Sequence, residues 1–114
     1  SPGWKRLEVQ DAGGVVIIND TYNANSDSMR LAIDALVDIP CTGRKIAVLG
    51  DMLELGAAGI VEHEKIGRYI QHSPIDLLLT YGENARLYGI ENGSRSHGHY
   101  DSREKLLGEL KTIV

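Results

Sequence analysis

Residues 15–37 read VVIINDTYNANSDSMRLAIDALV, and this stretch decides the fold class. Its opening β-branched run is typical of a strand that is covered on both faces. A polar loop follows, and Ser26 is then well suited to cap a helix that we expect to end near Val37. The apolar residues of this helix recur on one face and would pack on the sheet; they are Met29, Ile33 and Leu36.

Strand and helix patterns alternate through the rest of the chain. Polar and apolar side chains alternate over residues 4–9, as they do in a half-buried edge strand. The further expected elements are strands at 45–49 and 76–81, helices at 60–71, 84–88 and 102–110, and a loop at 91–100. This order implies right-handed βαβ crossovers. The predicted fold is therefore α/β, with a doubly wound, mostly parallel, Rossmann-like sheet in three layers.

The composition limits the classes of function. Of the 114 residues, 42% are hydrophobic and 25% are charged, which indicates a globular domain. The formal net charge of −4 argues against nucleic acid as a partner, because duplex binding needs a surplus of Lys and Arg. Cys41 is the single cysteine, so a reducing compartment is expected. No apolar run approaches the roughly 18 residues of a membrane span, so no membrane partner is expected.

Two loops that follow predicted strands, at residues 19–29 and 49–56, carry the candidate binding residues. Ligands of open parallel sheets bind beyond the carboxyl ends of the strands. Asp20 directly follows a buried strand, where a carboxylate could accept from a ribose diol, and Asn23 and Asn25 can each donate and accept hydrogen bonds. The helix that follows points its positive end at the same place and favours an anion. The same residue types are also common at turns and caps for local reasons.

Both loops resemble signatures of the D-alanyl-D-alanine-adding ligases of the Mur ligase family. NDTYNANSDSM at 19–29 is similar to the family's D-x-Y-N-A-N-P-x-S-M, and KIAVLGDMLELG at 45–56 is similar to its strand followed by G-D-M-x-E-L-G. EHEKIG at 62–67 resembles the next stretch, in which a His precedes a Val/Ile-Gly pair. The matches come in the family's order and at its spacing, and they cover about residues 6–82.

The resemblance implies a nucleotide contact from three residues. Asp20 matches the family's aspartate that contacts the nucleotide ribose. Arg6 matches an arginine near the interdomain linker that also contacts the nucleotide. The family commonly has Gly-Arg there, whereas this chain has GWKR at 3–6, so Lys5 could take the role instead.

The resemblance also implies a substrate side of the site. Tyr22, Asn23 and Asn25 match the core of the first signature and would line the D-Ala-D-Ala and phosphate side. Asp51 and Glu54 belong to the second signature, whose loop is expected to shape the substrate-binding cleft between domains. They could also be acid–base groups, but we prefer the cleft-shaping role, and we assign no catalytic residue and no metal ligand to this chain.

The family's activity is that of a three-domain, ATP- and Mg²⁺-dependent ligase. Its first domain holds the UDP-sugar, its central domain carries the P-loop for ATP, and its third domain brings the amine substrate. The carboxylate of UDP-MurNAc-tripeptide is phosphorylated, and D-Ala-D-Ala attacks the acyl phosphate in bacterial, cytoplasmic peptidoglycan precursor synthesis. Residues 1–114 would be this third domain, a fragment without the first two, and inactive alone. SPG at 1–3 is interpreted as a linker remnant.

Other features of the sequence limit this interpretation. Ser26 stands where the family usually has proline, and the family's later Lys-Gly-Ser-Arg stretch is not found. The chain has no G-x-x-x-x-G-K-[ST] string, so we do not expect it to bind ATP phosphates by itself. His97-x-His99 lacks a suitably spaced third ligand, and a solvated loop is preferred to a metal site. His63 shares a helical face with apolar residues, which favours a packed, hydrogen-bonded histidine.

Two other interpretations stay open. The chain could be the same domain of another amide ligase, one that adds L-Ala, D-Glu, a diamino acid or, on folate, glutamyl units. It could also be a free-standing flavodoxin-like binding module with no enzymatic role. The Tyr-Asn-Ala-Asn string at 22–25 favours the D-Ala-D-Ala enzyme, whereas a free-standing module would bind its ligand alone.

Overall fold

The computed structural model of the chain describes residues 6–9, 15–19, 25–40, 43–52, 55–90 and 96–113. The elements of the first half are β1 (Arg6–Val9), β2 (Val15–Asn19), α1 (Ser26–Asp38), β3 (Lys45–Leu49) and the 3₁₀ turn η1 (Gly56–Ala58). Those of the second half are α2 (Gly59–Gln71), β4 (Leu77–Tyr81), α3 (Arg86–Ile90), β5 (Ser96–Tyr100) and α4 (Arg103–Ile113). No helix among the described residues is long and apolar enough to cross a membrane.

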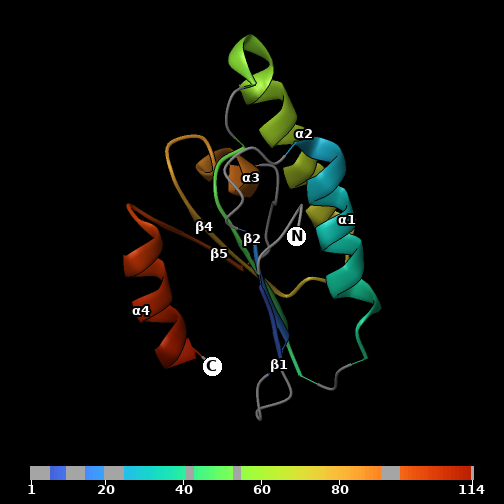
Figure 1. Cartoon of the computed structure of the whole chain (residues 1–114), viewed down its shortest axis with the longest axis vertical. Helices are drawn as coiled ribbons and strands as arrows, with labels where there is room; N and C mark the ends of the chain where they lie inside the picture. The colour runs from blue at the N-terminus through green and yellow to red at the C-terminus, as the bar shows by residue number, and fades with distance from the viewer. Residues whose placement is uncertain are drawn as a thin grey trace.

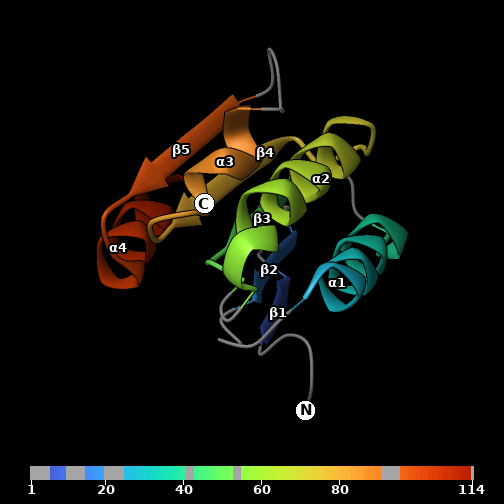
Figure 2. The same ribbon diagram turned by 90° about the horizontal axis from the view of Figure 1, so that it is seen from above.

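The described strands form one open sheet in the order β1-β2-β3-β4-β5. β1 pairs antiparallel with β2, and the other three neighbouring pairs are parallel. Figure 2 shows the strands side by side, with helices on both sides of the sheet. The predicted α/β fold with a mostly parallel sheet and an N-terminal edge strand is therefore confirmed, and the structure adds that this edge strand is antiparallel.

Helices cover both faces of this sheet, and its strands supply a separate core to each face. Side chains of β3 alternate: Ala47 and Leu49 pack with α1, α2 and α3, whereas Ile46 and Val48 pack with α4. This alternation follows from the two-residue period of a strand. Figure 1 shows α1 and α4 on opposite sides of the strands. The strand order contains no reversal, so the three layers arise because α4 lies on the face opposite the other helices.

The expected helix faces are buried in the structure. Met29 and Ile33 of α1 and Ile66 and Ile70 of α2 are each at most 2% exposed and belong to one core cluster. One expectation was wrong: residues 96–100 are strand β5, paired in parallel with β4, rather than loop. The sequence SHGHY lacks the apolar alternation of a half-buried strand, and its pairing rests on backbone hydrogen bonds, which leave no pattern in side chains.

Candidate functional site

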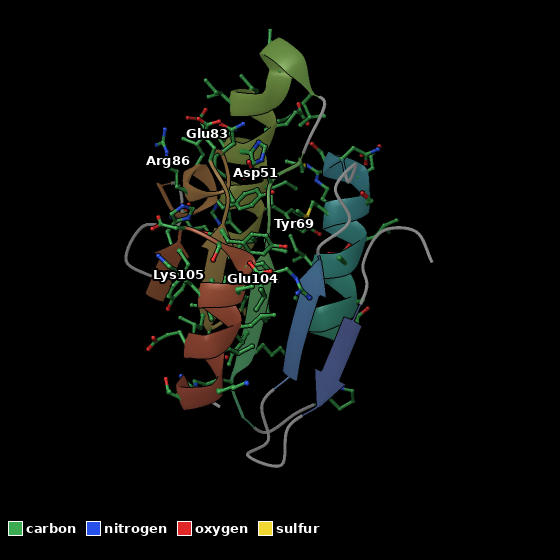
Figure 3. The ribbon with its side chains drawn as sticks, turned by 60° about the vertical axis from the view of Figure 1, so that its left-hand side comes forward. Asp51, Tyr69, Glu83, Arg86, Glu104 and Lys105 are labelled. Carbon is green, nitrogen blue, oxygen red and sulfur yellow. The ribbon has the colours of Figure 1, made fainter. Side chains whose placement is uncertain are left out.

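The carboxyl ends of three neighbouring strands meet at one edge of the sheet. Asn19 of β2 is in register with Leu49 of β3, which is in register with Thr80 of β4. The loops that leave these strands therefore begin side by side, and the first two are the loops in which the sequence placed the candidate binding residues. Figure 3 shows Asp51, Glu83 and Arg86 at this same end of the molecule.

Asn25 caps α1 at this edge through a reciprocal pair of hydrogen bonds. The backbone N–H of Ser28 donates to Asn25 Oδ1 at 3.0 Å, and the N–H of Asn25 donates to Ser28 Oγ at 3.0 Å. This is the geometry of a capping box, with serine in the position usually held by Glu or Gln. The expected cap, Ser26, is instead the first residue of α1, and its hydroxyl donates to Glu62 of α2. Either residue type can cap a helix, so composition alone did not separate them.

Asp51 is bound to the turn that follows β4. Its Oδ1 accepts from the backbone N–H of Ala85 at 2.6 Å and of Asn84 at 3.0 Å, and Oδ2 lies 3.2 Å from the same Asn84 nitrogen. These amides lie just ahead of α3, so the carboxylate orders the start of that helix from a different loop. The loop of Asp51 was expected to shape the substrate-binding cleft. The structure adds that the Asp51 carboxylate binds the backbone amides of Asn84 and Ala85.

Two glycines allow the loops after β3 and β4 to approach each other. Gly82 has φ +108°, and a Cβ there would lie 2.5 Å from Asp51 Oδ1. A Cβ on Gly50 would lie 2.7 Å from the Tyr81 ring. Only glycine fits both the conformation and the space at Gly82. The G-D pair of the second signature and the Gly after β4 are therefore parts of one packed unit.

His63 and Tyr88 hold the same loop from beneath. His63 is fully buried, and its Nε2 accepts from the Met52 backbone N–H at 3.0 Å. The Tyr88 hydroxyl donates to the Gly50 carbonyl at 3.0 Å, and the two rings pack with centroids 5.0 Å apart. Burial raises the pKa of Tyr88 well above its ordinary value, and the nearby Asp51 carboxylate raises it further. The expectation of a packed, hydrogen-bonded His63 is confirmed.

Several predicted site residues lie outside the described residues. These are Lys5, Asp20, Tyr22, Asn23 and Glu54. Arg6 is in β1, where its backbone pairs with Ile18. Of the predicted residues, the described structure therefore brings only Asn25 and Asp51 to the carboxyl edge with defined side-chain contacts, and their roles toward a ligand stay predictions.

The turn after β4 is part of this edge, and sequence reasoning did not select it. Glu83 and Arg86 are exposed there, beside the amides that bind Asp51. The available signal was the polar string Gly82-Glu83-Asn84 directly after an apolar strand, in the position that parallel sheets use for ligands. His99, considered as half a metal site, has its Nδ1 2.7 Å from the Thr80 hydroxyl. The described residues contain no group of three His, Cys, Asp or Glu side chains that could hold a metal ion.

Comparison with known proteins identifies the family. The sequence model of the "Mur ligase, glutamate ligase domain" matches residues 5–113. The chain belongs to this family. A UDP-N-acetylmuramoyl-tripeptide–D-alanyl-D-alanine ligase of Mycobacterium tuberculosis is 38% identical over 104 residues, covering 87% of this chain and 20% of the relative. The ligase of the same name from Bacillus subtilis is 37% identical over 113 residues, covering 93% and 24%.

Solved structures of this Mur ligase group have the same fold. A crystal structure of MurF from Acinetobacter baumannii superposes with a TM-score of 0.74 at 30% identity, covering 99% of this chain and 24% of that one. MurF from Thermotoga maritima, in complex with ADP, gives a TM-score of 0.72 at 28% identity, covering 100% and 25%. The Mur ligase domain described here thus spans about a fifth to a quarter of the length of the relatives it matches.

Proposed function

We propose that this chain is the third domain of an ATP-dependent ligase that joins D-Ala-D-Ala to UDP-MurNAc-tripeptide in peptidoglycan precursor synthesis, in the bacterial cytoplasm. The observation that carries the proposal is the family match over residues 5–113, together with relatives named for this reaction at 37–38% identity. The domain's part is to close over the reaction site and to bring the amine substrate.

The phosphates of ATP and the Mg²⁺ ion are assigned mainly to the central domain of the full-length enzyme. The sequence has no P-loop string, and the described residues contain no cluster of three metal-ligating side chains. The sequence therefore does not fit a P-loop phosphate cradle, and the described residues do not fit a Mg²⁺ site. ATP supplies the phosphoryl group that makes a carboxylate oxygen a leaving group, and a MurF structure with bound ADP is consistent with this use.

The contribution of this domain is orientation and exclusion of water. An amine attacks an activated carboxyl group only when the two are held close and aligned, and an activated carboxyl group is lost if water reaches it. The carboxyl edge supplies a surface for this purpose, with α1 capped by Asn25 and the loop after β3 fixed by Asp51. Domain closure would bring this edge onto the nucleotide.

The proposed roles of the individual residues follow the family signatures. On the nucleotide side, Asp20 would contact the ribose, with Arg6 or Lys5 beside it. On the acceptor side, the residues proposed to line the cleft for D-Ala-D-Ala are Tyr22, Asn23, Asn25, Asp51 and Glu54. Asp51 would act there mainly by fixing the loop, since its oxygens already bind two backbone amides.

The test is an ADP-release assay on the full-length enzyme that contains this domain, with UDP-MurNAc-tripeptide as the carboxyl substrate. ADP release should rise when D-Ala-D-Ala is added and should not respond to L-Ala, D-Glu or a diamino acid. No response with the tripeptide, together with a response to one of those amines when UDP-MurNAc carries a shorter peptide or none, would instead move the chain to a sibling ligase. This chain alone should release no ADP, because it lacks the P-loop, and turnover by the isolated chain would contradict the division of roles.

A titration distinguishes the remaining alternative, a free-standing binding module. Isotope-edited NMR spectra of this chain can be recorded with D-Ala-D-Ala and then with ATP. Weak shifts confined to residues 20–25 and 50–56, or none, fit a site completed by the closed interdomain cleft. Tight binding of a ligand by the isolated chain, without the other domains, would favour the module.

A further inference from the structure

We propose that His63 is a positioning residue of the ligase, which fixes the loop after β3 for binding of D-Ala-D-Ala through its hydrogen bond to Met52. The inference rests on the proposed function, because it concerns that reaction's amine substrate. His63 lies on α2, beneath the carboxyl edge, and its side chain is 0% exposed. It therefore acts through the loop and not by touching substrate.

The hydrogen bonds of His63 fix its tautomer. Nδ1 lies 2.6 Å from the Gly59 carbonyl oxygen, which can only accept, so Nδ1 carries the proton. Nε2 lies 3.0 Å from the Met52 backbone nitrogen, whose N–H can only donate, so Nε2 is the acceptor. Both ring nitrogens are satisfied by the neutral ring in one orientation. A ring turned over, or protonated on both nitrogens, would lose the bond to Met52.

The bond to Met52 lies where it controls the loop. Met52 ends the described part of the loop that leaves β3, and Glu54, a proposed substrate contact, follows two residues later. The Met52 side chain is itself only 2% exposed and packs in the core. The backbone at Met52 is therefore fixed from both sides, directly after Asp51, a residue that is proposed to line the cleft for D-Ala-D-Ala.

A second contact couples the same histidine to the start of the loop. The Tyr88 ring packs against His63 at an interplanar angle of 32°, and its hydroxyl donates to Gly50 at 3.0 Å. Two helices, α2 and α3, thus bind residues 50 and 52 of one loop from below. Loss of either contact leaves a buried polar backbone group without its partner, which costs far more than loss of a surface contact.

The two bonds of His63 separate positioning from simple core stability. The Gly59 bond stays within α2, whereas the Met52 bond crosses to the loop. A histidine needed only for stability would make both bonds equally important and leave substrate affinity unchanged. If His63 instead positions the loop, the KM for D-Ala-D-Ala should depend only on whether residue 63 accepts a hydrogen bond from the Met52 N–H, and not on its bond to Gly59.

The experiment compares two isosteres in the full-length enzyme. His63→Gln carries an oxygen near the place of Nε2 and retains an acceptor for Met52, whereas His63→Asn retains only the polar group near Nδ1. His63→Asn should raise the KM for D-Ala-D-Ala about 5- to 30-fold, as expected for a buried amide that loses its acceptor. Its kcat and its KM for ATP should change by less than about 3-fold, and His63→Gln should stay within about 3-fold of the wild type throughout.

The control variant is Ile70→Val, on the same helix and also fully buried. It should lower the Tm without changing the KM for D-Ala-D-Ala, because it shortens a core side chain and leaves the loop's hydrogen bonds intact. Equal KM values for the Asn and Gln variants, measured below the Tm of both, would overturn the inference. If the wild-type enzyme released no additional ADP when D-Ala-D-Ala was supplied, the proposed function itself would be overturned instead.

A spectroscopic measurement covers the case in which the Asn variant does not fold. Imidazole ¹⁵N NMR of the wild-type chain should give the Nδ1–H tautomer for His63, together with a Met52 amide that is protected from hydrogen exchange. The opposite tautomer, or a Met52 amide that exchanges as fast as exposed loop amides, would overturn the inference without any reference to activity.

Discussion

The loop after β3 and the outer surface between α1 and α2 are both held by polar contacts, but in opposite surroundings. In the loop, His63, Tyr88 and Asp51 bind backbone groups, and the first two are completely buried. On the outer surface, the Tyr69 hydroxyl donates to the exposed Asp34, and the Arg30 guanidinium lies 5.1 Å from the centre of the Tyr69 ring.

The difference indicates where this domain is rigid. The outer contacts surround a surface pocket of about 390 Å³ that is lined by Arg30, Lys65, Arg68, Tyr69 and His72. Water can replace a lost partner there, so such contacts contribute about 0–1 kcal/mol each. No water replaces a lost partner beneath the carboxyl edge, where an unsatisfied group costs about 1–3 kcal/mol. Substitutions at the loop should therefore have larger effects than those at the outer pocket.

Gly82→Ala should have the largest effect on stability. An added Cβ would lie 2.5 Å from Asp51 Oδ1, at φ +108°, where side chains are strained. Relief of the clash would move Asp51 away from the amides of Asn84 and Ala85. We expect the free energy of unfolding, measured with urea, to fall by about 3 kcal/mol.

Gly108→Ala, in the middle of α4, is the matched control. Nothing lies within 4 Å of the Cβ it adds, and its backbone is helical. Because alanine is the better helix former, the substitution should raise the free energy of unfolding by about 0.5–1 kcal/mol. If Gly82→Ala were tolerated as well as Gly108→Ala, the loops after β3 and β4 would not be packed against each other.

Asp51→Ala should have the next largest effect. It removes the acceptor of two partly buried amides, and we expect a loss of about 2–3 kcal/mol in the free energy of unfolding. Asp51→Asn retains one acceptor oxygen and should lose about half as much. Asp34→Ala removes an acceptor from the outer surface and should lose only about 0.5–1 kcal/mol. Similar losses at positions 51 and 34, measured with urea, would abolish the distinction between the two regions.

The parts of the fold that depend on short-range pattern were predictable from the sequence. Lys45–Leu49 was expected as a strand and has those bounds, because a short apolar run between breaks is a strong signal. His63 was expected to be packed because it recurs on the apolar face of its helix with Ile66 and Ile70, and all three are buried. The two family signatures then located the carboxyl edge, because each of them contains the last residue of a strand and these two strands are neighbours in the sheet.

Contacts between distant parts of the chain were not predictable in the same way. Asp51 binds amides 33 and 34 residues away, and no local pattern records such a pair. The cap of α1 was misassigned by one residue because Asn25 and Ser26 are both good caps, and the choice depends on Ser26 bonding to Glu62 of α2. Asp20, Tyr22 and Glu54 lie outside the described residues, so their roles stay predictions.

The smallest predicted effect belongs to Glu62 of α2, whose side chain is 23% exposed on the outer surface. The Ser26 hydroxyl, and then Lys65 at 3.3 Å, hold the pKa of the Glu62 carboxyl below its ordinary value of 4.5. A lowered pKa in the folded state means that the contribution to stability is present above the unfolded value and is lost as the pH falls through the folded value. Ser26→Ala removes the larger cause, so the pKa of Glu62, followed by carboxyl ¹³C NMR, should rise toward 4.5.

Ser28→Ala separates this contact from the capping of α1, because the Ser28 hydroxyl bonds to Asn25 and not to Glu62. It should leave the titration of Glu62 unchanged while weakening the start of the helix. If Ser26→Ala also left the titration unchanged, the hydrogen bond between α1 and α2 would not persist in water. The outer surface would then depend on the Tyr69–Asp34 and Arg30–Tyr69 contacts and on packing, and Ser26 would contribute no polar contact between the two helices.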